Sequence, residues 1–196
     1  VRGNTASQLF EFGPDLKFIK QWGTDNYAAG FAHTVRVDKD DNVWMTDEGT
    51  NMIVKFNPQG NVSMVFGRKP ESLDYLERFI EHGDHIEPGP TTGGVGTYNR
   101  PTDVTWDPQG NIYVPDGYNN SRVVKLNNKG DWVKAVGTRG NGPDQFNTVH
   151  GIAADAKGLV YVADRGNRRI KVYDGELNLQ RMITSAAAPW SVCVTP

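Results

Sequence analysis

The chain has 196 residues, a formal net charge of −2 and 22% charged residues, and its apolar content of 37% is typical of a globular protein rather than a disordered one. The sequence has no basic block, which argues against nucleic acid as a partner, and no apolar stretch approaches the length of a membrane span. A single cysteine, Cys193, excludes a disulfide within the chain.

The residue pattern along the chain is that of an all-β protein. Glycine (22 residues) and proline (11 residues) are plentiful. Short alternating apolar runs are bounded by Gly, Asn, Asp and Pro, whereas long helical periodicity is scarce. We therefore expect many short strands joined by tight turns.

In chain order, the elements form complete and partial copies of one unit. Residues 1–23 hold two apolar runs around a Gly-Pro-Asp turn and predict the last two strands of a partial unit. Residues 31–67 form the first complete unit, and residues 68–98 form an insertion whose start predicts a short helix. Two more complete units follow, at 100–137 and 148–184. Residues 188–196 predict the first strand of a last, partial unit.

Each complete unit follows the same internal plan. A short strand ends in an aspartate, a tight turn leads to a second strand with a central aromatic residue, and another aspartate precedes a polar tip. A third and a fourth strand complete the unit. The repeated residues are Asp38, Trp44 and Asp47, then Asp107, Tyr113 and Asp116, then Asp155, Tyr161 and Asp164. Four short antiparallel strands in a repeat of roughly 40 residues predict the blades of a β-propeller.

The number of blades bears on closure of the ring. Neighbouring blades must stack around an axis because one blade cannot bury both of its faces. Three blades and two pieces do not close a large ring, and an open ring leaves bare strand edges. We therefore expect an open arc that could self-associate through its open blade edges, or closure of the ring through another chain or through residues missing from this sequence.

One position of the repeat has distinctive chemistry. The start of the innermost strand holds His33, Thr102, His150 and Trp190 in successive blades. A side chain there can point to the mouth of the central channel, so two histidines on alternate blades can converge. Neutral imidazole is a good zinc ligand, and three ligands with an open fourth position form the usual catalytic zinc site. Spacing alone leaves open whether this pair binds metal or only hydrogen bonds to backbone or water.

Other polar residues have simpler explanations. Recurrence of Asp47, Asp116 and Asp164 in every blade predicts turn and cap hydrogen bonds rather than catalysis. We expect Arg168 and Arg169 to be solvated charges at a strand edge, and Cys193 to be a buried thiol. The remaining histidines, His82 and His85, are expected to be ordinary loop residues of the insertion.

Four stretches carry a family resemblance: "AHTVRVDKDDNVWMTD" (32–47), "DGYNNSRVVKL" (116–126), "GPDQFNTVHGIA" (142–153) and "VADRGNRRIKVY" (162–173). They resemble NHL repeats and, more closely, the propeller of peptidyl-α-hydroxyglycine α-amidating lyase and its bacterial homologues. The resemblance covers nearly the whole chain. It implies that the chain is a fragment of a six-bladed propeller with zinc at one end of the channel.

The resemblance also implies roles for single residues. Of three zinc-binding histidines, two match His33 and His150, and the third would lie beyond Pro196. The proposed catalytic tyrosine of the family matches Tyr118, and two substrate-binding arginines match Arg165 and Arg2. A structural calcium ion would be held partly by the backbone carbonyl of Val35. The resemblance further implies a secreted or periplasmic enzyme with a small-molecule or peptide substrate. Its reaction would cleave a peptidyl-α-hydroxyglycine to a peptide amide and glyoxylate.

The chemistry asked of Tyr118 and Arg165 is feasible. A neutral phenol is a poor base near neutral pH, so a nearby zinc ion or arginine would have to favour the phenolate before Tyr118 takes a proton from a substrate hydroxyl. Arg165 could hold a carboxylate or carbonyl by paired hydrogen bonds. The simpler alternatives are a surface tyrosine in a turn and a salt bridge from Arg165 to Asp164 or Asp116.

Two other functions stay open. The chain could be a non-catalytic NHL module that binds a protein or small ligand on one propeller face, since propellers host many functions. It could also be part of a metal-dependent propeller hydrolase such as a lactonase. That class usually shows acidic calcium ligands in the channel, and no such set can be assembled from this sequence.

Overall fold

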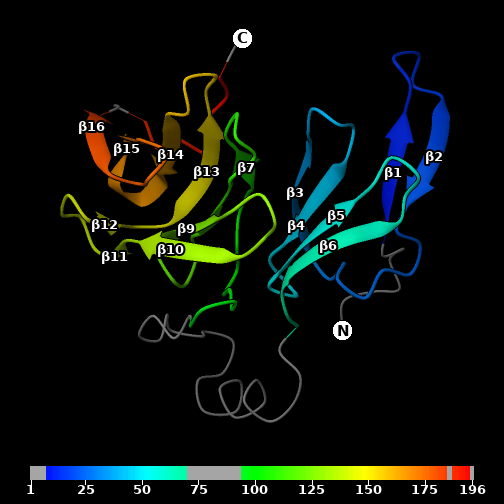
Figure 1. The fold of residues 1–196 in the computed structure, drawn as a ribbon, viewed down its shortest axis with the longest axis horizontal. Coiled ribbons are helices and arrows are strands. Elements are labelled where there is room, and N and C mark those ends of the chain that lie inside the picture. The colour runs from blue at the N-terminus through cyan, green and yellow to red at the C-terminus, as the bar shows by residue number, and fades with distance from the viewer. Residues whose placement is uncertain (1–7, 70–93, 185–186, 195–196) are drawn as a thin grey trace.

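A computed structural model describes residues 8–69, 94–184 and 187–194 of the chain. The described residues are almost entirely strands and turns; the one helical element among them is a short 3-10 turn, η1 (Arg165–Asn167). An N-terminal hairpin and three four-stranded antiparallel sheets follow one another across the molecule in chain order (Figure 1). The all-β prediction and the four-strand repeat are therefore confirmed.

Each sheet is a simple up-and-down meander. The strands are listed in order of pairing. The first blade contains β3 (Ala32–Val37), β4 (Val43–Asp47), β5 (Met52–Phe56) and β6 (Val62–Gly67). The second contains β7 (Thr105–Trp106), β8 (Ile112–Asp116), β9 (Arg122–Leu126) and β10 (Trp132–Val136). The third contains β13 (Val149–Ala154), β14 (Val160–Asp164), β15 (Arg169–Tyr173) and β16 (Leu179–Thr184).

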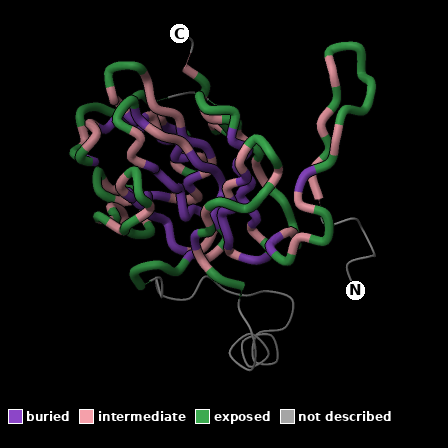
Figure 2. Tube along the Cα trace, turned by 45° about the vertical axis from the view of Figure 1, so that its right-hand side comes forward, coloured by how far each residue is buried: buried purple, intermediate pink, exposed green. Residues whose placement is uncertain are grey.

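Two smaller pairs complete the strands. The N-terminal hairpin joins β1 (Leu9–Phe12) to β2 (Phe18–Trp22), and a short parallel pair joins β11 (Thr138–Arg139) to β12 (Gln145–Phe146). Among the described residues β1 pairs with β2 alone. The hairpin tip projects from the molecule and is exposed (Figure 2). Self-association through the unpaired edge of β1 stays a prediction.

The repeated aspartate and aromatic residue of each blade act together. The Asp107 carboxylate accepts hydrogen bonds from the backbone N–H groups of Gln109 and Asn111, which closes the turn between β7 and β8. The Tyr113 hydroxyl then donates to the same carboxylate at 2.9 Å. Trp44 donates to Asp38, and Tyr161 donates to Asp155, in the other blades. The spacing of six residues between aspartate and aromatic is thus a side-chain clamp on the first hairpin.

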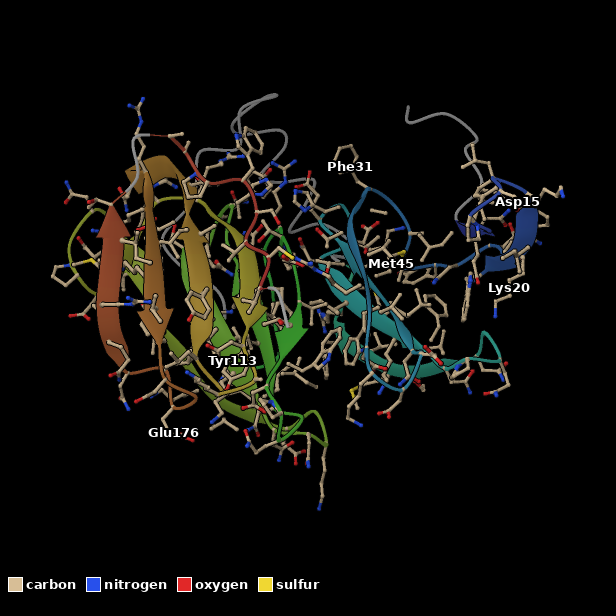
Figure 3. The ribbon with its side chains drawn as sticks, turned by 90° about the horizontal axis from the view of Figure 1, so that it is seen from above. Asp15, Lys20, Phe31, Met45, Tyr113 and Glu176 are labelled. Atoms are coloured by element: carbon tan, nitrogen blue, oxygen red, sulfur yellow. The ribbon has the colours of Figure 1, made fainter. Side chains whose placement is uncertain are left out.

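The hydrophobic core lies between blades rather than within them. One cluster joins Trp44 and Ile53 of the first blade to Val114 and Val124 of the second. Equivalent clusters join the second blade to the third, and the hairpin to the first blade. Figure 3 shows Met45 and Tyr113 in the interior, with Glu176 at an edge. Because apolar burial depends on the neighbouring blade, blade stacking fixes the whole arrangement.

Several expectations from the sequence either differ from the structure or lie outside the described residues. Residues 187–194 contain no assigned strand, although the sequence predicts the first strand of a further blade there; the described residues offer no second strand of that blade as a partner. Cys193 is exposed rather than buried for the same reason. Arg2 and the insertion between 70 and 93, with its predicted helix, lie outside the described residues.

Membrane insertion through a helix finds no support in the fold. Within the part of the chain that the structure describes, no helix has the length and apolar character needed to cross a bilayer.

Candidate functional site

An open hollow of about 660 Å³ lies at the innermost strands of the three blades. We call it the channel hollow. It is lined by Phe31, His33, Thr34, Val35, Arg36, Glu48, Asp103, Tyr118, His150, Trp190 and Ser191. Four of the residues predicted to form the site, His33, His150, Tyr118 and Val35, therefore share one cavity, although His33 and His150 are far apart in the sequence.

Both histidines sit at irregularities in their strands. The register between β3 and β4 shifts between Ala32 and Thr34, and that between β13 and β14 shifts between Val149 and Gly151. His33 and His150 are the residues inside these shifts. An extra residue in one strand of an antiparallel pair bends the strand and redirects a side chain. The same backbone device in two blades thus places the two imidazoles in the channel hollow.

Backbone carbonyls of the following blade hold both imidazoles. His33 Nδ1 lies 2.7 Å from the carbonyl oxygen of Thr102, and His150 Nδ1 lies 2.7 Å from that of Trp190. A carbonyl oxygen can only accept, so each Nδ1 carries the proton and each Nε2 keeps a lone pair. In the blade between them, the Thr102 hydroxyl makes a similar bond to the carbonyl of Val149.

The two Nε2 atoms converge on one hydroxyl. Tyr118 Oη lies 3.2 Å from His150 Nε2 and 3.5 Å from His33 Nε2, and the two imidazole ring centres are 4.9 Å apart. The hydroxyl has one proton, so it can donate to only one of the two nitrogens. One acceptor lone pair therefore remains available to a cation or another donor.

The position of Tyr118 depends on Gly117. A Cβ atom at Gly117 would lie 1.7 Å from the backbone oxygen of Val149, the residue before His150. Only a glycine allows the tip of the second blade to approach the third blade this closely. The Asp-Gly-Tyr string thus brings the phenol against the imidazole of the next blade.

Arg165 lies above Tyr118 and Trp190. It belongs to η1, at the tip of the third blade. Its guanidinium carbon lies 5.6 Å from the ring centre of Tyr118 and 4.2 Å from that of Trp190, within the range of cation–π attraction. The carboxylates of Asp164 and Asp116 pair instead with Arg169 and Arg122. The structure therefore does not favour the salt-bridge alternative for Arg165.

Arg169 corrects an expectation. It is buried rather than solvated, donates to Asp164 at 2.7 Å, and donates to the carbonyls of Asn141, Gly142 and Gln145. The loop that covers it is remote in sequence from β15, which explains why local pattern suggested an exposed strand edge. Arg168 is exposed, as expected.

Sequence reasoning missed Arg100. Arg100 belongs to the loop before β7, and its guanidinium carbon lies 5.9 Å from the ring centre of Tyr118. No repeat position or motif pointed to it, and its relation to Tyr118 arises from the packing of the loop against the tip of the same blade.

The protonation of His150 is shifted by its surroundings. Burial lowers the pKa of His150, and the nearby charges of Arg165 and His33 act in the same direction, while the hydrogen bond to the Trp190 carbonyl opposes them. The neutral form, which is the one that binds metal, is therefore favoured.

The described residues supply only part of a metal site. They contain no group of three or more His, Cys, Asp or Glu side chains arranged to hold an ion. His33 and His150 fit as two of three zinc ligands, because their Nε2 lone pairs converge. For calcium, the structure offers the Val35 position at the channel hollow, while both Asp103 oxygens nearby bind Arg36.

Comparison with known proteins agrees with the fold. Residues 146–173 match the NHL repeat family. NHL repeat-containing protein 3 of Mus musculus is 29% identical over 185 residues, covering 88% of this chain and 47% of that protein. A probable peptidyl-alpha-hydroxyglycine alpha-amidating lyase of Caenorhabditis elegans is 27% identical over 160 residues, covering 79% of this chain and 41% of that protein.

A solved structure gives the same picture. Virginiamycin B lyase from Staphylococcus aureus superposes with a TM-score of 0.63 at 11% identity, covering 96% of this chain and 53% of that one. The chain thus has a propeller fold with an NHL repeat, and its similarity to amidating lyases agrees with the resemblance seen in its motifs. It spans about half the length of the first curated relatives.

Proposed function

We propose that this chain forms part of a zinc-dependent lyase that cleaves peptidyl-α-hydroxyglycine to a peptide amide and glyoxylate. The observation that carries the proposal is the convergence of two imidazole Nε2 atoms on the Tyr118 hydroxyl, with Arg165 above the phenol ring. Similarity to proteins named amidating lyases supports this reaction class over other lyases.

The donor set suits a zinc ion. His33 and His150 would supply two neutral imidazoles whose orientation is already fixed by carbonyl acceptors, a common arrangement behind metal-binding histidines. When bound, zinc would polarise the substrate hydroxyl and make its proton easier to remove. A third ligand would have to come from outside the described residues.

The side chains of the chain itself would then perform the proton transfers. The Tyr118 oxygen, as phenolate, takes the proton of the substrate hydroxyl, and the carbon–oxygen bond becomes a carbonyl as the carbon–nitrogen bond breaks. The electron pair of that bond goes to the amide nitrogen, which receives the proton back from Tyr118. Arg165, beside the phenol ring, can hold the substrate carboxylate.

Metal binding gives one test that does not depend on turnover. We expect the protein to bind zinc in a calorimetric titration, and His33→Ala or His150→Ala to weaken binding by at least about tenfold. The matched controls are His82→Ala and His85→Ala, which remove the other two histidines of the chain. Zinc affinity that survives the first pair and falls with the second would refute the assigned ligands.

Turnover gives the direct test. A full-length protein that contains this chain is loaded with zinc and incubated with an N-acyl-α-hydroxyglycine, and glyoxylate release is measured. Release above the background rate supports the lyase, and no release at saturating zinc contradicts it.

A non-catalytic binding module is the second candidate. It is favoured by the presence of only two of three expected histidine ligands among the described residues. It predicts that the protein binds no zinc and that mutation of His33 and His150 leaves ligand binding unchanged. Calcium at Val35 and a secreted or periplasmic location remain predictions.

A further inference from the structure

We propose that Arg100 is a second carboxylate-binding residue of this site, which acts with Arg165 beside the ring of Tyr118. The identity of the carboxylate, that of an α-hydroxyglycine substrate and its glyoxylate product, rests on the proposed function. Binding of a small carboxylate by Arg100 does not.

The backbone of Arg100 is unusual for an arginine. Its φ is 60°, in the left-handed region, and it precedes Pro101. Residues with a Cβ are disfavoured in that region, and a following proline favours extended conformations. Thr148, two residues before His150 as Arg100 is before Thr102, has a φ of 56°. Two of the three blades thus adopt this conformation at the equivalent position, where glycine or asparagine would be accommodated more easily than arginine.

Two hydrogen bonds hold the strained backbone in place. The Arg100 N–H donates to Asn51 Oδ1 of the first blade at 2.8 Å, and the Arg100 carbonyl accepts from the Tyr118 N–H at 3.4 Å. Both use main-chain atoms, so any residue could make them. The fold thus explains the conformation of residue 100 but not the choice of an arginine side chain.

The side chain of Arg100 is available to a ligand. It is 46% exposed, and its ion-pair partner among the described residues is Glu48, at 4.0 Å, which is too long for a hydrogen bond. Within those residues no hydrogen bond engages the guanidinium. Glu48 lines the channel hollow, so the end of the Arg100 side chain lies at its border.

Two guanidinium groups therefore lie close to one phenol ring. Their carbons lie 5.9 Å (Arg100) and 5.6 Å (Arg165) from the Tyr118 ring centre. In an α-hydroxyglycine, the carboxylate is bonded to the same carbon as the hydroxyl. A substrate whose hydroxyl meets the Tyr118 oxygen thus presents its carboxylate next to the side chains around Tyr118, and guanidinium groups suit carboxylates well.

A simpler role for Arg100 would be to neutralise Glu48. The two roles can be separated with Glu48→Gln, made alone and together with Arg100→Gln. If Arg100 binds a carboxylate ligand, removal of the competing Glu48 charge should leave ligand affinity unchanged or raise it. If Arg100 only neutralises Glu48, the Glu48→Gln change should restore the function lost in Arg100→Gln.

The experiment measures glyoxylate affinity by calorimetry and KM for an N-acyl-α-hydroxyglycine. We expect Arg100→Gln to weaken glyoxylate binding and raise KM by about tenfold or more, with kcat changed much less, because a charge-assisted hydrogen bond to the ligand is lost. Arg100→Gly should weaken binding equally while it raises the melting temperature, because glycine relieves the left-handed backbone.

Arg168 provides the matched control. It is also an exposed arginine with a left-handed backbone (φ 54°) at a blade tip. Arg168→Gly should raise the melting temperature but leave glyoxylate affinity and KM unchanged.

The outcomes separate this inference from the proposed function. Turnover of hydroxyglycine with an unchanged KM in Arg100→Gln overturns the role of Arg100 and leaves the lyase intact. Glyoxylate binding that depends on Arg100 without any turnover supports the carboxylate site and contradicts the lyase. Recovery of binding in the Glu48→Gln, Arg100→Gln double variant, or absence of glyoxylate binding altogether, overturns the inference.

Discussion

Two positions of the same repeat carry polar side chains with opposite properties. At the end of the second strand, Asp47, Asp116 and Asp164 are fully buried, and each accepts three or more hydrogen bonds from backbone or neighbouring side chains. At the start of the innermost strand, His33 and His150 are partly exposed, and their two Nε2 atoms face one hydroxyl, which can donate to only one of them.

The difference lies in whether hydrogen-bonding capacity is used up. A carboxylate whose acceptor positions are filled by its own blade and loop stabilises the fold and has little left for a ligand. A pair of acceptors with one donor between them is incomplete by itself and suits a cation or substrate. The residues that are identical in every blade thus stabilise the fold, whereas the position that changes between blades is the one that the proposed function uses.

The largest expected effect tests the structural half of this comparison. Asp164→Asn leaves Arg169 buried beside a neutral amide, and loss of one partner from a buried ion pair costs about 3 to 5 kcal/mol of unfolding free energy. Urea denaturation measures the change. Asp40→Asn, whose side chain is 63% exposed, is the control and should change stability by less than about 0.5 kcal/mol. Equal effects of the two substitutions would contradict the structural role.

The second prediction tests the functional half. Tyr118→Phe removes the hydroxyl between the imidazoles and should lower kcat/KM for hydroxyglycine cleavage by about 100-fold or more, the usual contribution of a general base. Stability should change little, because the ring remains. Tyr161→Phe also deletes a phenol hydroxyl, from the turn clamp on Asp155, and should affect stability but not turnover. Full activity of Tyr118→Phe would remove Tyr118 from the mechanism.

A third substitution should affect both halves. Gly117→Ala places a methyl group against the Val149 carbonyl, so the blade tip must shift, at a cost of about 1 to 3 kcal/mol. The shift also moves Tyr118 away from His150 and should lower turnover. Gly94→Ala, which meets no neighbouring atom within 4 Å, is the control. A variant with normal stability and normal turnover would show that the tip does not need to lie so close.

The smallest expected effect is a pH dependence. Burial lowers the pKa of His150 in the folded protein below its ordinary value of 6.5, so the unfolded chain takes up a proton first as the pH falls. The stability associated with neutral His150 is thus complete above about pH 6.5 and declines as the pH falls toward the lowered value. In metal-free buffer, His150→Gln should reduce this decline in urea midpoints between pH 8 and 5. An identical pH profile for both proteins would contradict the shift.

Much of the fold follows from the sequence because the blade is a local structure. The aspartate turn, the aromatic six residues later and the alternating strands are all encoded within about 40 residues, so periodicity alone predicts the three sheets. The equivalence of His33 and His150 follows from the same alignment. The motif resemblance adds Tyr118 and Arg165, whose places on blade tips the alignment also gives.

Tertiary structure decided the rest, because it depends on contacts between blades and loops. Bulges turn the two histidines into the channel hollow, and carbonyls from the next blade fix their tautomers. The burial of Arg169 and the approach of Arg100 to Tyr118 depend on loops that leave no periodic trace in the sequence. A repeat therefore specifies which positions face the channel, but only packing of one blade on the next specifies which atoms meet there.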